Sequence, residues 1–151
     1  MNLTPLTADL IQVEIGRFLT PYVKQGLWGI SCLAAGADTI FANQVIRLGG
    51  RLQVILPSPN YRERKVKPAD LVTFDALIGA ATKVTTMPFT DPNRDAYQAA
   101  NETLMDSSDL IVAVWDGRAA ADKGGTGAVV EAARARAIPV QIIWPEGAER
   151  A

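Results

Sequence analysis

Apolar residues follow two patterns that alternate along this chain. Short continuous apolar runs are typical of strands buried on both faces of a parallel sheet, and apolar residues at helical spacing predict amphipathic helices. We predict strands at 27–33, 52–56, 83–87, 110–115 and 140–144, and several of these are such runs. The helical spacing predicts helices at 8–24, with Thr4 or Thr7 as its cap, and at 38–48, 69–81, about 92–107 and 128–137. The alternation predicts an α/β, Rossmann-like, doubly wound fold with a mainly parallel sheet.

The start of the chain departs from that fold class. A doubly wound fold usually opens on a central strand, whereas residues 1–6 are polar or turn-like and the first periodic segment is a helix. We therefore expect the fold to lack the usual first strand. Its absence should leave either a gap between strands 27–33 and 110–115 or exposed backbone groups. The tail from Glu146 is expected to be frayed.

Length and composition exclude several classes of protein. The chain has 151 residues and an apolar fraction of 48%, which suits one domain, 1–151, with a real core. A net charge of −1 argues against nonspecific nucleic-acid binding. No apolar run approaches the roughly 20 residues that span a bilayer, and no signal peptide is visible. The expected location is the cytoplasm, with no membrane partner.

The chain contains no histidine and a single cysteine, Cys32. This composition excludes Ser-His and Cys-His nucleophile pairs as well as histidine or cysteine-cluster metal sites, so neither a metal nor a cofactor is predicted. Any catalysis has to use carboxylates, Lys, Arg, Tyr or bound water. Cys32 lies in an apolar strand, and we interpret it as a core residue rather than a nucleophile.

A glycine cluster follows the predicted strand 110–115. The residues that this segment offers to a ligand are Asp116, Gly117, Gly124, Gly125, Thr126 and Gly127. Glycines let a backbone approach an anion closely, and the free N–H groups of the helix that follows favour phosphate. The alternative is a tight strand-to-helix turn without a ligand. Asp116 is a candidate for accepting ribose hydroxyls, or a simple turn former.

A second small-residue loop, 34–38, follows the predicted strand 27–33. Ala35 and Gly36 are candidate phosphate contacts, and Asp38 either accepts ribose hydroxyls or caps the next helix. Tyr97 and Asn101 share a helix face and either line the same pocket or pack ordinarily. The basic cluster 62–67, beside Tyr61, is either a DNA contact or a solvated loop.

Three segments together resemble the SLOG superfamily, which groups the Smf/DprA DNA-processing proteins, the YpsA-like proteins and the LOG phosphoribohydrolases. They are 31–38 (Ser-Cys-Leu-Ala-Ala-Gly-Ala-Asp), 49–57 (Gly-Gly-Arg-Leu-Gln-Val-Ile-Leu-Pro) and 105–117, which ends in Val-Trp-Asp-Gly. The resemblance covers about residues 27–145. It implies a Rossmann-like nucleotide-binding domain.

Residues 123–131 (Lys-Gly-Gly-Thr-Gly-Ala-Val-Val-Glu) are similar to the PGGxGTxxE motif of LOG enzymes. This similarity implies that Gly124, Gly125 and Gly127 bind phosphate, that Glu131 is a catalytic carboxylate, and that the protein forms a homodimer through helices beside the site. The arginine that works with this glutamate in the family has no counterpart here. Its position falls near Ala100–Asn101, and Arg94 lies about two turns earlier.

The sequence therefore predicts a protein that binds a nucleotide or nucleotide-derived ligand and forms a homo-oligomer. One alternative is a LOG-like phosphoribohydrolase that cleaves the N-glycosidic bond of a nucleoside monophosphate, using Glu131 to stabilise oxocarbenium character or activate water. A second alternative is DprA-like DNA binding.

Overall fold

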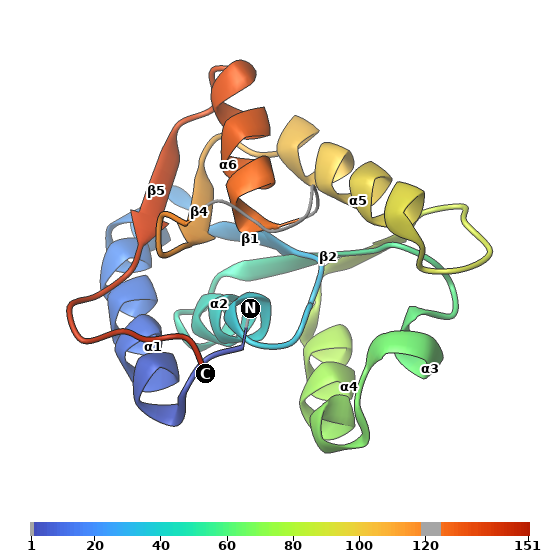
Figure 1. Ribbon diagram of the computed structural model, residues 1–151, viewed down its shortest axis with the longest axis horizontal. Coiled ribbons are helices and arrows are strands. Elements are labelled where there is room, and N and C mark those ends of the chain that lie inside the picture. Colours follow the sequence, from blue (N-terminus) through green and yellow to red (C-terminus); the bar gives the residue numbers. More distant parts are fainter. Residues whose placement is uncertain (1, 119–124) are drawn as a thin grey trace.

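The five strands of the computed structural model form two parallel sheets, and the structure describes residues 2–118 and 125–151 (Figure 1). The strands are β1 (Trp28–Ser31), β2 (Arg51–Leu56), β3 (Lys83–Thr86), β4 (Ile111–Val114) and β5 (Val140–Ile143). One sheet has the order β1-β2-β3, and the other pairs β4 with β5. All five predicted strands are confirmed, and most are shorter than predicted.

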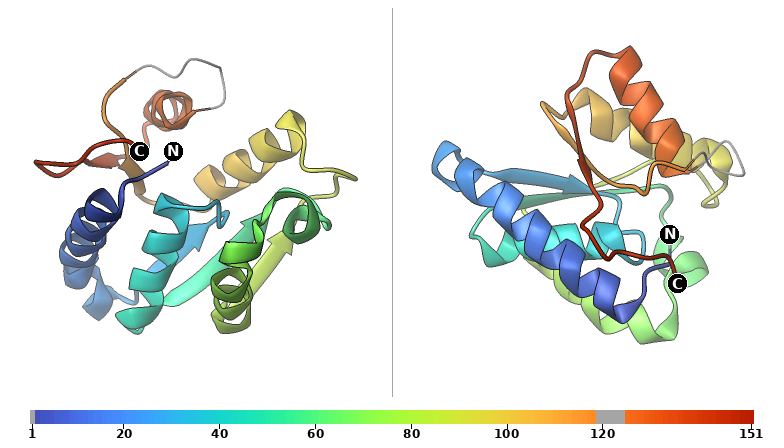
Figure 2. Two further views of the ribbon diagram at one scale, coloured as in Figure 1. Left: turned by 60° about the horizontal axis from the view of Figure 1, so that its bottom comes forward. Right: turned by 60° about the vertical axis from the view of Figure 1, so that its left-hand side comes forward.

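Helices cover both faces of these sheets. The α-helices are α1 (Pro5–Leu19), α2 (Ala37–Arg47), α3 (Tyr61–Lys65), α4 (Leu71–Ala80), α5 (Arg94–Asp106) and α6 (Thr126–Ala135), and the 3₁₀-helices are η1 (Thr20–Gln25) and η2 (Pro68–Asp70). In Figures 1 and 2, α1, α2 and α4 lie on one side, and α5 and α6 on the other. This α/β/α layering is the predicted Rossmann-like fold.

The first helix begins where its cap was expected but ends earlier. Thr4 Oγ1 accepts a hydrogen bond from the Thr7 N–H at 3.1 Å, and Pro5 occupies the first turn, where no N–H donor is needed. Pro21 interrupts the predicted helix because it offers no N–H to continue the ladder, and the chain tightens into η1. Gly26 ends η1 with a left-handed φ of 81°.

The segment of the basic cluster 62–67, for which a solvated loop was one interpretation, contains short helical turns. Tyr61 begins α3 and is buried, with its ring 6.2 Å from that of Phe74 and 6.3 Å from that of Tyr97. Tyr61 is therefore a core residue that anchors the segment. The start of α5 is fixed by Asn93, whose Oδ1 accepts from the Ala96 N–H at 2.9 Å.

The main core surrounds the three-stranded sheet. Leu52, Val54 and Ile55 of β2 are fully buried, and the fully buried Ile11 and Ile15 of α1 belong to the same core. A smaller cluster lies beside β4 and β5, built on Met105, Ile111 and Ala133. The central strand of the larger sheet is therefore mostly apolar, with Gln53 as the polar residue within the segment 52–56, as expected for a strand covered on two faces.

The gap expected from the sequence is present. In the described residues, β1 pairs only with β2 and β4 pairs only with β5, so no strand joins the two sheets. The predicted gap between strands 27–33 and 110–115 is thus confirmed.

The tail after Glu146 is ordered, which corrects the expectation that it would fray. The Glu149 N–H donates to Thr7 Oγ1 at 2.7 Å, and Arg150 forms an antiparallel bridge with Leu3. The two ends of the chain therefore lie side by side (Figures 1 and 2). None of the helices described for 2–118 and 125–151 combines the length and apolarity needed to cross a membrane.

Candidate ligand-binding site

The loop after β1 is held by its own side chains. Ser31 Oγ accepts from the Leu33 N–H at 3.0 Å, and Asp38 Oδ2 accepts from the Ala34 N–H at 3.2 Å. Leu33 and Gly36 have left-handed φ values of 55° and 91°, and this turns the chain sharply into α2. The N-cap of α2 is Gly36, so the interpretation of Asp38 as the cap is wrong. Asp38 instead lies in the first turn and closes the loop.

Burial perturbs the acids beside this loop. Desolvation raises the pKa of Asp38, while the hydrogen bond from Ala34 acts in the opposite direction. Burial, with a smaller contribution from the nearby Asp38 carboxylate, raises the pKa of Cys32 to about 12. The thiol therefore stays protonated near neutral pH, which agrees with the interpretation of Cys32 as a structural residue.

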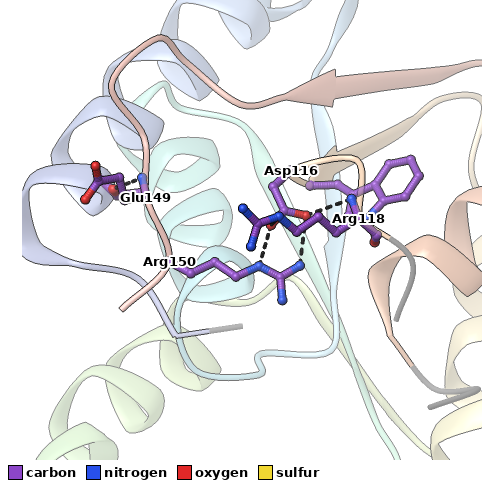
Figure 3. Close-up of polar contacts among 6 residues, drawn as sticks. Asp116, Arg118, Glu149 and Arg150 are labelled. Atoms are coloured by element: carbon purple, nitrogen blue, oxygen red, sulfur yellow. Dashed lines mark hydrogen bonds and ion pairs between the residues drawn. The ribbon is translucent and has the colours of Figure 1, made fainter. Parts of the chain in front are cut away.

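The loop after β4 begins with an Asp-Gly turn. Asp116 Oδ1 accepts from the Arg118 N–H at 3.0 Å, and Gly117 adopts a left-handed φ of 82°. Arg150 reaches Asp116 from the tail, with its Nε at 2.5 Å from Oδ2 and its Nη2 at 2.8 Å from Oδ1 (Figure 3). The hydrogen bonds from Arg150 and Arg118 hold the pKa of Asp116 below its usual value. The carboxylate proposed to accept ribose hydroxyls is thus already engaged by two arginines.

The glycine segment leads into α6. Gly124 lies outside the described residues, and Gly125 is the N-cap of α6 without a side-chain cap bond. The first N–H groups of a helix lack partners within the helix and can face an anion. Gly127 is buried, and a Cβ there would lie 3.3 Å from Trp115 Cζ2. The close neighbour of Gly127 is therefore the Trp115 ring, which would have to shift slightly to admit a side chain.

One cavity connects the two loops. It has a volume of about 560 Å³ and is lined by Ala37 and Asp38 from the first loop and by Gly125 and Thr126 from α6. Asn101 also lines it, whereas Tyr97 packs edge-on against Tyr61. Of the described candidates, the structure brings Asp38, Gly125 and Thr126 to this cavity. The described candidates outside its lining are Ala35, Gly36, Asp116, Gly117, Gly127 and Glu131.

The proposed catalytic residue, Glu131, is exposed on α6. Ala100, near which the family's arginine would fall, is buried with 1% of its surface exposed. The basic cluster is partly neutralised: Arg62 binds both carboxylate oxygens of Asp75 at 2.8 and 2.7 Å, and Arg64 lies 3.8 Å from Asp91.

Two features of this region were not predicted from the sequence. Arg150 was not expected at Asp116, because a pair separated by 34 residues leaves no local pattern. The contribution of α1 to the cavity, through Ile15 and Leu19, was also missed. The helical periodicity of α1 showed an apolar face without showing what that face would cover.

Among known proteins, this chain has a match in the solved structures, found by fold. No family model matches the sequence, and no curated protein matches it. Among solved structures, the chain is similar to the X-ray structure of DNA processing protein A (DprA) from Streptococcus pneumoniae, with a TM-score of 0.68 and 17% identity. The match covers 95% of this chain and 47% of that chain, so this chain spans about half of its neighbour's length. The likeness supports the Rossmann-like fold.

Proposed function

We propose that this protein binds a nucleotide or nucleotide-derived ligand at the mouth of the cavity between β1 and β4. The observation that carries the proposal is the meeting of two loops: Asp38 from the first and Gly125 and Thr126 from the start of α6 line the same cavity. Both follow strands, and this is where Rossmann-like folds bind ligands.

The chemistry of the two loops suits a phosphorylated ligand. The N–H groups at the start of α6, with the positive end of its dipole, favour a phosphate, and Gly125 leaves room for close approach. Asp38 offers a second carboxylate oxygen to a ribose hydroxyl while Oδ2 keeps the Ala34 hydrogen bond. A cavity of about 560 Å³ lies within the size range of ligand sites.

The proposal is tested by calorimetric titration with AMP, ADP-ribose and NAD against a matched pair of variants. Thr126→Glu places a carboxylate at the start of α6, where the dipole favours the helix but the charge repels phosphate. Thr73→Glu makes the same change in the first turn of α4 at an exposed position away from the cavity. We expect affinity to fall roughly tenfold or more in Thr126→Glu only. Equal affinity in both variants, or no binding by the unaltered protein, would reject the site.

The phosphoribohydrolase is the first alternative, and its support is the register of Glu131 with the LOG motif. Release of ribose 5-phosphate from nucleoside monophosphates tests it directly. If the alternative holds, Glu131→Gln should abolish turnover and leave ligand affinity within a few-fold. Unchanged turnover in that variant would remove the glutamate from the reaction.

DNA binding is the second alternative, and it is favoured by the likeness to the structure of a DNA processing protein. The net charge of −1 and the pairing of Arg62 with Asp75 weigh against it. A mobility-shift titration at low salt with single- and double-stranded DNA separates this alternative from nucleotide binding.

A homodimer or larger assembly, with the predicted helix 92–107, which is α5 here, as an interface element, stays a prediction. Sedimentation at micromolar protein should give a mass above that of the 16.2 kDa chain. A mass equal to that of one chain would contradict it.

A further inference from the structure

The facing edges of the two sheets carry backbone groups without partners. The Arg51 N–H donates to the carbonyl of Leu27, the residue before β1, at 2.9 Å. Every second residue from there on, namely Leu27, Gly29 and Ser31, therefore directs its peptide groups toward β2. Because N–H and C=O directions alternate along a strand, those of Trp28 and Ile30 face away from β2. In the described part of the chain, neither residue has another backbone partner.

β4 shows the same arrangement. The Ile111 N–H donates to the Pro139 carbonyl at 2.9 Å, and the Trp115 N–H donates to the Ile143 carbonyl at 3.2 Å. These bonds direct alternate residues of β4 toward β5. The N–H and C=O groups of Val112 and Val114 therefore face the opposite way, and the described residues give them no backbone partner either.

Both open edges border the cavity of about 560 Å³. All four residues of β4, 111–114, line it, and so do Trp28, Ile30 and Ser31 of β1. Successive side chains of a strand point to opposite faces of the sheet. A cavity that touches consecutive residues of both strands therefore lies against their edges, where the unpaired peptide groups are.

Apolar side chains enclose this space from both helix layers. Ile15 and Phe41 line it from α1 and α2, and Leu104 and Val129 line it from α5 and α6. An occupant is thus offered hydrogen bonds at two edges and apolar contacts on two faces. A β-strand with apolar residues on both faces has this combination of groups.

We propose that this cavity is a strand slot, defined by Trp28, Ile30, Val112 and Val114, that takes up an extended apolar peptide segment of a partner polypeptide. The segment pairs with β1 on one edge and β4 on the other, and it joins the two sheets into one. Since both strands have four residues, a segment of roughly five residues fills the slot. This inference goes beyond nucleotide binding and does not rest on it.

The test uses amide hydrogen exchange of the full chain, followed by NMR, with the peptide acetyl-Lys-Val-Ala-Val-Ile-Val-Lys-amide. Exchange should slow at Trp28, Ile30, Val112 and Val114. It should stay unchanged at Gly29 and Ala113, whose amides face β2 and β5 by the same alternation. The same peptide N-methylated at its five central residues keeps its apolar surface but loses its donors toward both edges, and it should give no protection.

A matched pair of variants tests whether the peptide binds in the slot. Val129→Glu puts a charge among the lining residues, and Val72→Glu puts one on α4, where the side chain is 83% exposed. Peptide affinity should fall roughly tenfold or more in the first variant and stay unchanged in the second. If Val129→Glu does not fold, the comparison of the two peptides on the unaltered chain still tests the proposal.

Three results would overturn the proposal. They are no protection at millimolar peptide, equal binding of the N-methylated peptide, or protection in the free protein that is lost on dilution. The last result would assign the slot to a second copy of the chain. Nucleotide titrations are a separate measurement. If the protein binds no nucleotide but the peptide still protects the slot amides, only the proposed nucleotide site is rejected.

Discussion

The three-stranded half of the molecule, with β1 to β3, and the two-stranded half, with β4 and β5, use the same parallel pairing but differ in burial. β2 has neighbours on both sides, and three of its side chains are fully buried. β5 ends a two-stranded sheet, and of its residues only Ile143 is buried. The larger sheet therefore supplies most of the core, while the smaller one positions a loop and a helix beside it.

The two candidate loops lie where these halves face one another, and they are fixed differently. The loop after β1 is closed locally by Ser31 and Asp38. The turn after β4 is held from a distance by Arg150. The second loop therefore depends on the tail, and the first does not.

The largest expected effect comes from removing core volume in each half. Leu52→Ala, which truncates a fully buried side chain of β2, should lower the free energy of unfolding by about 4 kcal/mol. Ile111→Ala, beside the cavity, should cost about 2 kcal/mol, because it removes fewer packed contacts. Urea denaturation measures both, and equal losses would show that the halves are packed alike.

Enlarging Gly127 tests how the start of α6 is packed. Gly127→Val should lower the free energy of unfolding by about 2 kcal/mol, because its side chain meets the Trp115 ring. The control is Gly79→Val in α4, where nothing lies within 4 Å of a Cβ, and it should change stability by less than about 0.5 kcal/mol. If nucleotide binding survives in a folded Gly127→Val protein, this glycine serves packing and not phosphate approach.

Asp38 and Asp75 should contribute to the pH dependence of stability with opposite signs. Because burial raises the pKa of Asp38 in the folded state, its contribution favours folding below about pH 4 and is lost as pH rises through the folded pKa. The pKa of Asp75 is lowered by Arg62, so its contribution is present above about pH 4 and is lost as pH falls. Urea midpoints between pH 3 and 7 measure both effects (about 0.1 M salt).

The variants separate these two contributions. Asp38→Asn should remove the decline with rising pH, and Asp75→Asn should remove the decline with falling pH. A steeper decline with rising pH in Asp38→Asn would contradict the burial of its carboxyl.

The smallest effect on stability is expected from Arg150→Ala, because the Arg150 side chain is 43% exposed and Arg118 still lies near Asp116 in its absence. Its clear readout is the pKa of Asp116, which should rise toward the ordinary value once the guanidinium is gone. Carbon-detected NMR titration of the carboxyl measures this change. Arg17→Ala, which breaks a local pair with Glu14 on α1, is the control and should leave the Asp116 titration unchanged.

The sequence predicted the order of elements well because strand and helix periods differ clearly in this chain. The mostly apolar segment 52–56 lies within β2, and the Thr4 cap was recognisable from residue type and position. The gap between β1 and β4 also followed, because a helix opens the chain where a central strand was expected.

The remaining features depend on contacts between distant residues. Nothing local to Arg150 indicates Asp116 as its partner, and nothing local to Tyr61 distinguishes a core ring from a loop aromatic. For Asp38, the local pattern gave the wrong role. Its position suited a helix cap, but α2 begins one residue earlier, after Gly36 with its positive φ, and the Asp38 carboxylate accepts from the Ala34 N–H instead.

The contact between the two ends of the chain has a consequence for rearranging the gene. The Ala151 N–H donates to the Asn2 carbonyl at 3.1 Å, so a short Gly-Ser connector can join the ends without displacing a strand. New termini opened in the segment 87–93, between β3 and α5, would give a circular permutant that begins with the two-stranded half. Such a permutant keeps every strand pairing while reversing the order in which the ribosome delivers the two sheets.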